Sequence, residues 1–369
     1  MGKKVCHFSS VHRVNDIRVF HKECRTLTTG YDVSLVACPA EVPSGSGVSV
    51  ITLQSKGGRL RRMLTGALNA YSAAKAQKAD LYHFHDPELL PYGLLLKTFT
   101  GARVVYDSHE CYPDDILTKE WIPLPLRKVI ASAFRVLEDF VVKRLDLVVA
   151  ATSHIEERFK PVARRTVTIN NYPLLEEFVQ AQSQEVAKDG FCYVGAISHV
   201  RGILPLMDSL DFVDRGIRFY LAGTFASADI EAQVKGHRNW DRVTYLGQVS
   251  RREISEVYSK SFAGIVNFLP APNHIYSQPN KLFEYMSAGI PVVCSNFDLW
   301  RSVVETGECG ICVDPSSPRA LAEAVNAIHG DSSLWSAYSS NGRRLIEEKY
   351  SWNREGQRLL QSYDEVLAL

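Results

Sequence analysis

The sequence predicts an α/β protein built from two doubly wound parallel sheets in tandem. Three observations lead to this fold class. Short β-branched and aromatic runs alternate with longer amphipathic segments, which is the pattern of βαβ units. A polar stretch at residues 176–189 interrupts the alternation, and the same pattern then restarts. At 369 residues the chain is also longer than one hydrophobic core usually supports.

The first half alternates predicted strands and helices. Apolar runs predict strands at residues 3–10, 31–38, 48–54, 80–86, 102–110, 145–152 and 166–173. Segments with helical periodicity predict helices at residues 16–30, 59–79, 87–100, 123–143 and 153–163. Asp16 is the expected N-cap of the first helix, and Gly30 is its expected end. A helix between consecutive strands implies that the strands run parallel.

The second half repeats this pattern and ends in an additional helix. Its predicted strands lie at residues 190–198, 217–224, 242–248, 262–268 and 291–296. We therefore expect a first domain at residues 1–178, a second domain at residues 179–347 and a C-terminal helical segment at residues 348–369. Ligands of doubly wound sheets bind beyond the carboxyl ends of the strands, so the functional residues should line a central cleft between the halves.

Composition limits the partners and the compartment. The 42 Lys and Arg residues face 41 Asp and Glu residues, for a formal net charge of +1. This balance argues against a general polyanion binder, and no nucleic-acid partner is expected. The N-terminus lacks the apolar region of a signal peptide, and no run approaches the ~18 apolar residues of a membrane span. We expect a cytoplasmic protein whose eight scattered cysteines stay reduced.

The stretch YSQPNKLFEYMSAG predicts a helix that begins at Pro279, with Ser277 or Gln278 as its cap. The free amides of the first turn and the helix dipole form an anion site, and Lys281 adds a positive charge. Glu284 lies far enough along the helix to accept hydrogen bonds from vicinal ribose hydroxyls. An ordinary amphipathic helix with a solvated glutamate has the same local pattern.

The stretch YVGAISHVRG predicts a strand that ends at Gly195 and a loop that leads to a helix opened by Arg201 and Gly202. Small residues let the backbone approach a ligand, and Arg201 can bind a phosphate group through two hydrogen bonds. A solvated arginine at a common strand–loop–helix turn is the alternative.

Histidines gather at strand ends in the first half. His83 and His85 share one face of a strand because side chains alternate with a period of two, and His109 with Glu110 ends the next strand. Zinc binding, acid–base chemistry and hydroxyl recognition all suit such a group. No spacing here is diagnostic of a metal, so no metal is assigned, and each histidine alone also fits a structural role.

Two segments are candidates for peripheral membrane contact. The basic stretch at residues 55–64 precedes an amphipathic helix, and the segment at residues 117–135 carries Trp121 and Ile122. Contact with anionic lipid head groups at the inner face of the cytoplasmic membrane is one interpretation. A solvated basic face over an apolar stripe is the other.

Taken together, these motifs resemble the retaining glycosyltransferases of family 4, which have the GT-B fold, and within them the bacterial group that builds surface polysaccharides. The resemblance covers nearly the whole chain through VNDIRVFHKECRTL, YHFHDPELLPYGLLLK, RVVYDSHE, INNYP, YVGAISHVRG, PNKLFEYMSAGIPVV and GECGICVDP. It also includes the closing YSWNREGQRLL, a helix that in this fold crosses back to the first domain. The resemblance implies two Rossmann-like domains facing a central cleft and a nucleotide-diphosphate sugar donor, such as a UDP- or GDP-sugar.

The resemblance also implies roles for residues of the donor side. Glu284 matches the second glutamate of the Glu-x7-Glu motif, which binds the ribose, whereas the first glutamate corresponds to Tyr276 here. Arg201 matches the basic residue that holds the diphosphate. The second basic residue of the family corresponds to Ala196, and Lys281 is the candidate substitute. The implied donor-binding residues are Gly195, Arg201, Ser277, Asn280, Lys281, Leu282 and Glu284.

On the acceptor side, His109 matches the histidine near the reacting centre, so His109, Arg201 and Lys281 are the candidate catalytic residues. The loop SVHRVNDIR replaces the Gly-Gly loop that many members have after the first strand. The acceptor-side candidates are Arg13, Asn15, Asp16, Arg18, His85, Asp86, His109 and Glu110. The implied acceptor is a glycan or lipid-linked glycan, and the reaction is expected to need neither a cofactor nor a metal ion.

Three alternatives have distinct signatures. A nucleotide-sugar 2-epimerase on the same fold would release nucleotide without an acceptor. A non-catalytic, two-domain sugar-binding protein of the periplasmic type should carry a signal peptide. A dinucleotide oxidoreductase should show G-x-G-x-x-G after the first strand, and this sequence does not.

Overall fold

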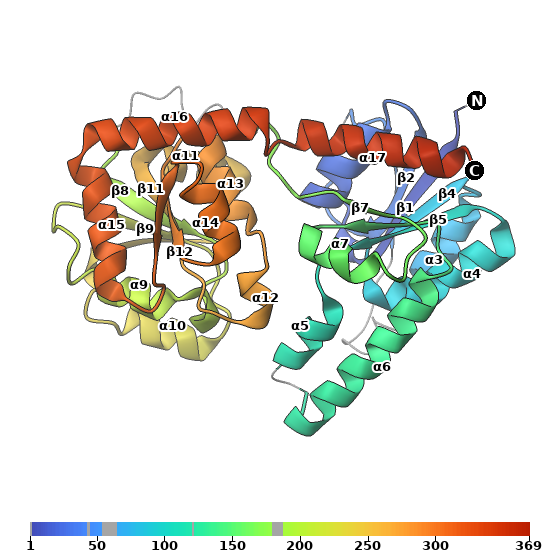
Figure 1. The fold of residues 1–369 in the computed structure, drawn as a ribbon, viewed down its shortest axis with the longest axis horizontal. Coiled ribbons are helices and arrows are strands. Elements are labelled where there is room, and N and C mark those ends of the chain that lie inside the picture. The colour runs from blue at the N-terminus through green and yellow to red at the C-terminus, as the bar shows by residue number, and fades with distance from the viewer. Residues whose placement is uncertain (1, 43–44, 54–64, 120–121, 179–186) are drawn as a thin grey trace. The chain divides into compact units, whose positions relative to one another are not determined.

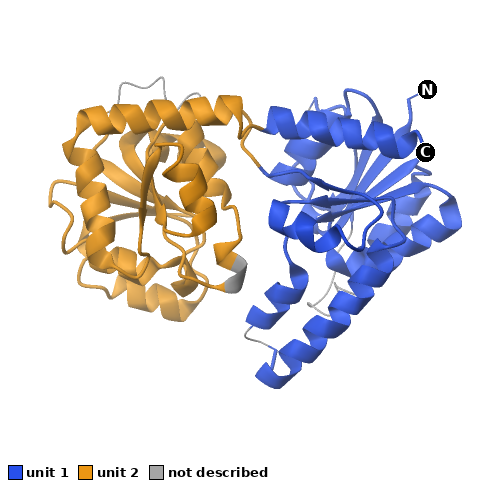
Figure 2. Cartoon of the chain, in the orientation of Figure 1, with its two compact units in different colours: residues 1–171, 352–369 blue, residues 172–351 orange. Residues whose placement is uncertain are grey.

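The computed structural model of the chain describes residues 2–42, 45–53, 65–119, 122–178 and 187–369 (Figure 1). The chain forms two compact units, each with its own parallel sheet (Figure 2). The first comprises residues 1–171 and 352–369, and the second comprises residues 172–351. The predicted fold class, with two doubly wound α/β domains, is confirmed.

The first unit is built on a seven-stranded parallel sheet with the order β3-β2-β1-β4-β5-β6-β7. Its strands are β1 (Lys4–Arg13), β2 (Asp32–Cys38), β3 (Ser49–Thr52), β4 (Leu81–Phe84), β5 (Arg103–Ser108), β6 (Leu147–Ala150) and β7 (Thr166–Thr168). The direction of strand addition reverses between β1 and β4. In open α/β sheets this switch point is where ligands bind.

Helices cover both faces of this sheet. They are η1 (Ile17–Cys24), α1 (Arg25–Leu27), α3 (Ala67–Ala76), η3 (Pro87–Leu89), α4 (Leu90–Thr100), α5 (Tyr112–Thr118), α6 (Leu124–Val142), α7 (Ser153–Phe159) and α17 (Trp352–Leu367). Helices α3, α4, α6 and α7 pack on an apolar core with one face. The π-helical η1 and the C-terminal α17 contact each other and contribute side chains to the opposite face.

Strand alternation divides polar from apolar residues in the three central strands. The side chains that join the apolar core are Cys6, Phe8, Tyr82, Phe84, Val104 and Tyr106. The intervening buried polar side chains are His7, Ser9, His83, His85 and Asp107. Since side chains of a strand alternate between faces, these polar residues share the face that carries η1 and α17. This row of polar residues leads toward the switch point.

The helix predicted at residues 16–30 takes an unusual form. Asp16 caps it as predicted, because its carboxylate accepts hydrogen bonds from the amides of Arg18 and Val19, both at 2.9 Å. The backbone then forms the π-helical η1 before the single turn of α1. Such wide turns within helices occur frequently at functional sites.

The second unit has a six-stranded parallel sheet with the order β10-β9-β8-β11-β12-β13. Its strands are β8 (Gly190–Val194), β9 (Arg218–Ala222), β10 (Val243–Gly247), β11 (Ser261–Val266), β12 (Val292–Ser295) and β13 (Gly310–Val313). Its helices are η4 (His199–Arg201), α9 (Ile203–Ser209), α10 (Ala228–Lys235), η5 (Trp240–Arg242), α11 (Arg251–Lys260), α12 (Pro272–Ile275), α13 (Asn280–Ser287), α14 (Asp298–Val304), α15 (Pro318–Gly330) and α16 (Ser332–Glu348). The switch point lies between β8 and β11.

The first unit ends earlier than the predicted boundary at residue 178. Tyr172 packs its ring on Phe283 at a centroid distance of 4.8 Å, and Phe178 packs on Tyr258 at 5.3 Å. Residues 172–178 therefore belong to the core of the second unit.

The C-terminal helix α17 belongs to the first unit, and the change of unit falls at residue 352 rather than at 348. Trp352 Nε1 donates to Thr26 Oγ1 over 2.8 Å, and Glu355 Oε2 accepts from the Asn170 amide over 2.8 Å. Tyr350 still packs on Phe283 of the second unit. These contacts place Tyr350 in the second unit and Trp352 in the first.

Within the described residues, no helix combines the length and apolarity that crossing a membrane requires. The predicted basic stretch at residues 55–64 and Trp121 lie outside the described residues.

Candidate active site

In the first unit, His109 follows β5 near the switch point. Its Nε2 lies 2.7 Å from Asp107 Oδ2, and its side chain is 17% exposed. Asp107 itself is fully buried. His109 therefore lies at the end of the buried polar row. Asp107 contacts one of its ring nitrogens, and part of the ring remains exposed.

Asp107 is the centre of a buried charge network. Arg18 binds it through two hydrogen bonds, Nε to Oδ2 at 3.0 Å and Nη2 to Oδ1 at 2.9 Å. His85 Nδ1 adds a third contact at 3.1 Å. Burial opposes ionisation, but Arg18 and His109 outweigh it and hold the pKa of Asp107 well below its ordinary value. Asp107 is thus an ionised carboxylate that orients His109.

Two predicted acceptor-side residues lie inside this network. Arg18 is only 5% exposed and uses Nη1 on the Ile169 carbonyl at 2.8 Å. His85 is fully buried. Both side chains therefore position Asp107, and neither presents a surface to an acceptor.

His12, which the sequence analysis did not single out, lies beside His109 with a ring-centroid distance of 5.1 Å. Its Nδ1 lies 3.1 Å from Asp16 Oδ2, and its Nε2 lies 3.7 Å from Asp86 Oδ1. Burial lowers the pKa of His12, but Asp16 and Asp86 outweigh this effect and raise it above the ordinary value. His12 and His109 are thus neighbouring, partly exposed histidines of the site.

The remaining acceptor-side candidates have different environments. Asp86 is buried and accepts from Ser9 Oγ at 2.7 Å and from the Ser10 amide at 2.6 Å, which fixes the end of β1 against the end of β4. The exposed candidates are Arg13, Asn15 and Glu110. These three side chains, together with the half-buried Asp16 and His109, present the accessible surface of this set.

In the second unit, the loop after β8 packs closely against the end of β11. Gly202 has φ +62°, and a Cβ there would lie 2.3 Å from the Asn267 carbonyl oxygen. Asn267 Nδ2 donates to the Gly202 carbonyl at 3.1 Å. Only glycine fits this left-handed, crowded position. A Cβ on Gly195 would lie 3.2 Å from Arg201 Nη1, so that glycine gives the guanidinium room.

Aromatic contacts link Arg201 to the segment before α13. The Arg201 guanidinium lies 4.9 Å from the centre of the Phe268 ring, and Phe268 packs edge-on against Trp300. Trp300 Nε1 donates to the Ser277 carbonyl at 2.7 Å. The two donor-side motifs of the sequence therefore meet at the carboxyl edge of one sheet.

Helix α13 begins one residue later than predicted. Pro279 is its N-cap and not its first residue, because φ −68° and ψ 127° are extended values. Ser277 does not cap the helix, since its Oγ donates to the His274 carbonyl at 2.8 Å. The Leu282 amide bonds the Pro279 carbonyl, whereas Asn280 is exposed at the start of the helix.

Glu284 is held by three side chains. Its Oε1 accepts from Arg251 Nη1 at 3.1 Å, and its Oε2 accepts from Lys281 Nζ at 2.5 Å and from Tyr258 Oη at 3.1 Å. Burial alone would raise the pKa of Glu284, but Lys281 and Arg251 hold it below its ordinary value. Glu284 is thus ionised and fixed in direction, and it is 6% exposed.

Both units match glycosyltransferase family models. The model described as "Glycosyl transferase 4-like domain" matches residues 24–171, and the model described as "Glycosyl transferases group 1" matches residues 188–331. The chain belongs to this family of glycosyltransferases.

Curated relatives of this glycosyltransferase include the O-antigen chain mannosyltransferase C of Escherichia coli, which is 23% identical over 74% of this chain and 71% of its own length. Spore coat protein SA of Bacillus subtilis is 25% identical over 47% of this chain and 48% of its own length. A phosphatidyl-myo-inositol mannosyltransferase of Mycobacterium leprae is 33% identical over 25% of this chain. The chain therefore spans about half or less of the latter two relatives, since it covers 48% and 26% of them.

Solved structures share the GT-B fold with this glycosyltransferase over its whole length. A sucrose-phosphate synthase from Thermosynechococcus elongatus superposes with a TM-score of 0.79 at 19% identity and covers 99% of both chains. Anabaena HepE in complex with UDP-glucose has a TM-score of 0.70 at 16% identity, over 99% of this chain and 100% of that chain. At these identities the likeness concerns the fold.

Sequence reasoning missed several side chains of the candidate site: His12, Asp107, Arg251, Tyr258 and Asn267. The sequence did contain a signal for Asp107, because a charged residue inside the predicted strand VVYDSHE needs a buried partner of opposite charge. Arg251 and Tyr258 had none, because their contact with Glu284 depends on how α11 packs beside α13.

Proposed function

We propose that this glycosyltransferase moves a sugar from a nucleotide-diphosphate sugar to a glycan or lipid-linked glycan acceptor, with retention, in bacterial surface-polysaccharide synthesis. The observation that carries the proposal is the cationic site of the second unit. It combines Arg201, Lys281 and the start of α13 with the ionised Glu284 at the carboxyl edge of the sheet.

Arg201, Lys281 and the first turn of α13 would bind the diphosphate. Helix N-termini attract phosphate groups through their free amides and dipole. The diphosphate leaves with two negative charges, and cations that are already in place stabilise this charge as it develops. Lys281 could bind a phosphate oxygen while it keeps its hydrogen bond to Glu284, because its ammonium group can donate three hydrogen bonds.

Glu284 would bind the ribose. Among the described residues its Oε1 accepts a hydrogen bond from Arg251, and each carboxylate oxygen can accept about two. Because the Glu284 carboxylate is already oriented by Arg251 and Tyr258, little conformational entropy is lost when the ribose hydroxyls bind. Tyr276, at the position of the first glutamate of the family motif, is 51% exposed.

His109 is the catalytic candidate of the first unit. Asp107 Oδ2 orients its ring through the contact with Nε2 at 2.7 Å. This arrangement suits contact with the acceptor hydroxyl or the transferred sugar. Retention is the stereochemistry that family likeness favours, and the diphosphate site supplies the charge stabilisation that other transferases obtain from a metal ion.

The relatives support the donor and acceptor classes. HepE was solved in complex with UDP-glucose, and two curated relatives are named as mannosyltransferases. The O-antigen chain enzyme and the Staphylococcus aureus capsular polysaccharide glycosyltransferase CapM both act in surface-polysaccharide synthesis by name. A hexose donated by UDP or GDP is therefore the first candidate.

The proposal includes peripheral contact with the inner face of the cytoplasmic membrane. Helix α6 exposes a stripe of large apolar side chains, and the guanidinium of the exposed Arg144 lies over the Phe140 ring at the end of this stripe. The stripe comprises Leu126, Val129, Ile130, Val136, Leu137 and Phe140. An apolar stripe with basic flanks is typical of helices that lie on anionic lipid surfaces, where a lipid-linked acceptor resides.

A panel of UDP-, GDP- and other nucleotide sugars tests the proposal by thermal stabilisation, since tight ligands shift unfolding by mass action. The stabilising donor is then incubated with glycan acceptors, without added Mg²⁺ or Mn²⁺. Acceptor-dependent release of nucleotide diphosphate supports transfer. Release of nucleotide without an acceptor would favour the 2-epimerase alternative, and stabilisation without turnover would favour the sugar-binding alternative.

A further inference from the structure

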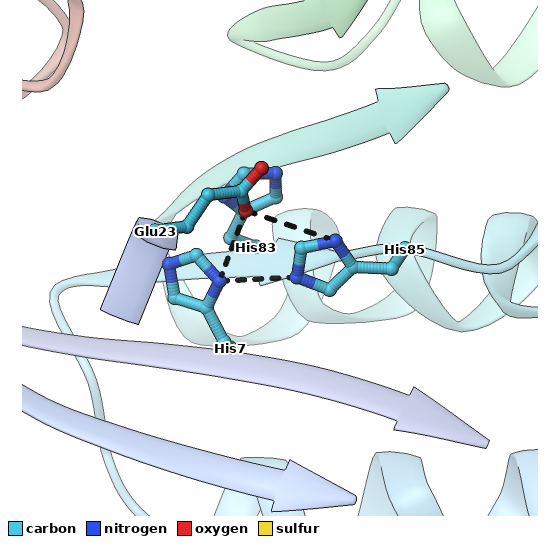
Figure 3. A group of neighbouring side chains, drawn as sticks. All are labelled: His7, Glu23, His83 and His85. Carbon is cyan, nitrogen blue, oxygen red and sulfur yellow. Dashed lines mark hydrogen bonds and ion pairs between the residues drawn. The ribbon is translucent and has the colours of Figure 1, made fainter. Parts of the chain in front are cut away.

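Four metal-binding side chains converge inside the first unit. His7 lies on β1, His83 lies on β4, His85 follows β4, and Glu23 lies on η1 (Figure 3). All four are fully buried, and each can offer one ligand atom within 4.8 Å of the others. His7 and His83 are direct neighbours on paired strands, and His85 shares their face two residues on.

Three atoms of this cluster have no hydrogen-bond partner within the described part of the chain. They are both carboxylate oxygens of Glu23 and Nε2 of His83. Arg18 Nε lies 3.0 Å from Glu23 Oε1, but its N–H group donates its hydrogen bond to Asp107 Oδ2. Buried polar atoms are nearly always paired, because leaving one unpaired costs roughly 1–3 kcal/mol. Three such atoms side by side point to a missing partner.

The histidines are oriented for coordination through their other ring nitrogens. His85 Nδ1 lies 3.1 Å from Asp107 Oδ2, His7 Nε2 lies 3.1 Å from Tyr363 Oη, and His83 Nδ1 lies 2.5 Å from the same Tyr363 Oη. Oxygen partners of this kind fix the rings of metal-binding histidines. They leave His83 Nε2 without a partner among the described residues, while His85 Nε2 and His7 Nδ1 are hydrogen-bonded to each other at 3.0 Å, a contact that an ion between them would replace.

The spacing of the available atoms suits a small tetrahedral ion. His7 Nδ1 and His85 Nε2 are 3.0 Å apart, and Glu23 Oε2 lies 3.8 Å from His7 Nδ1. Bonds of about 2.0–2.1 Å in a tetrahedron separate two ligand atoms by about 3.3 Å. Small side-chain shifts would therefore complete the coordination.

Protonation in the cluster is also compatible with a metal. Burial lowers the pKa of His7, His83 and His85, so their imidazoles are neutral, which is the form that binds metal ions. Burial raises the pKa of Glu23 well above its ordinary value, and Asp107 raises it further against the opposing effect of Arg18. A divalent cation would reverse this effect on Glu23 and bind it as a carboxylate.

We propose that His7, His83, His85 and Glu23 form a buried structural site for a divalent transition metal, with zinc as the best match. Three imidazoles and one carboxylate give four nitrogen and oxygen ligands of the types that zinc binds, and a buried set of four with no open position corresponds to a structural site. The ion would fasten β1, β4 and η1 together beneath Tyr363 of α17. The site lies in the first unit and uses none of the cationic residues of the proposed donor site.

Metal binding to the full, untagged chain tests the proposal. After metal removal and refolding, the chain should bind one Zn²⁺ ion. Mass spectrometry of the metal content measures this ratio. Zn²⁺ should raise the midpoint of thermal unfolding by several degrees. Co²⁺ should give the visible absorption of a tetrahedral complex. A folded wild-type chain that takes up neither ion would overturn the proposal.

The variant Glu23→Gln separates metal binding from packing. Glutamine keeps the shape of a neutral glutamic acid, so the metal-free variant should unfold near the metal-free wild type but gain little from Zn²⁺. Glu138→Gln is the matched control, since Glu138 is an equally buried glutamate of the same unit that contacts Tyr106 and Arg158. Zinc binding by Glu23→Gln equal to that of wild type would exclude this ligand set. None of these readouts depends on glycosyl transfer.

Discussion

Lys281 Nζ donates to Glu284 Oε2 over 2.5 Å, across one turn of α13. The same carboxylate accepts from Arg251 of α11, so two cations hold one buried anion beside the start of the helix. This arrangement links the phosphate-binding charge of Lys281 to the ribose-binding carboxylate in the proposed donor site.

The stability of the second unit should depend on pH through Glu284. Its pKa is lower in the folded chain than the ordinary 4.5. The ionised carboxylate therefore contributes stability that is fully present above about pH 4.5 and is lost as the pH falls through the lower folded pKa. Thermal unfolding of wild type and Glu284→Gln at several pH values checks this. The difference in midpoint should shrink below pH 4.5, and a constant difference would contradict the assignment.

Arg201→Ala should reduce turnover roughly 100-fold, the loss expected when one donor to a developing negative charge is removed. Stability should change little, because the contact with Phe268 contributes about 0.5–1 kcal/mol. Steady-state kinetics and thermal unfolding measure the two effects. Arg218→Ala, which removes an exposed ion pair with Asp189 in the same unit, is the control and should keep full activity. An active Arg201→Ala would remove its phosphate role.

His109→Asn and Asp107→Asn should separate chemistry from structure. His109 is partly exposed, so its loss should lower turnover by roughly 100-fold or more with a small effect on stability. Asp107→Asn leaves the buried Arg18 without its carboxylate and should cost on the order of 3–5 kcal/mol of unfolding free energy. Chemical denaturation of both variants tests the division. A fully active His109→Asn would exclude it as a catalytic residue.

The apolar stripe of α6 should bind anionic vesicles. Replacing Val129 and Val136 together with serine should weaken cosedimentation with vesicles roughly tenfold or more, because each valine loses apolar contact with lipid. Val200→Ser is the matched control, an exposed valine of the second unit. If the wild-type chain does not bind such vesicles, or if the double variant binds equally, the membrane contact is refuted.

Much of the fold was predictable from local sequence. Period-two alternation placed His83 and His85 on one face, and Asp16 was recognised as a helix cap. Both signals depend on residues a few positions apart. His7 and Glu23 join the same cluster only because β1 pairs with β4 and η1 covers that face, and strand order and helix packing are not encoded in local periodicity.

Charged side chains were harder to place. Arg18 reads as a surface residue in SVHRVNDIR, but its partner Asp107 lies 89 positions away. Ser277 reads as a cap, yet its carbonyl and hydroxyl are used by Trp300 and His274. In each case a specific tertiary contact outweighed the local preference, and that contact joins residues far apart in the sequence.

Calorimetric titration of nucleotide diphosphates and their sugars into wild type and Glu284→Gln tests the central claim most directly. We expect at least one UDP- or GDP-linked ligand to bind wild type, and its affinity to fall roughly tenfold or more in the variant, since a charged hydrogen bond contributes about 1.5–3 kcal/mol. Glu305→Gln, which removes an exposed carboxylate of the same unit, should bind as wild type does. Equal affinity in wild type and Glu284→Gln, or no binding by any nucleotide, would contradict the proposed donor site.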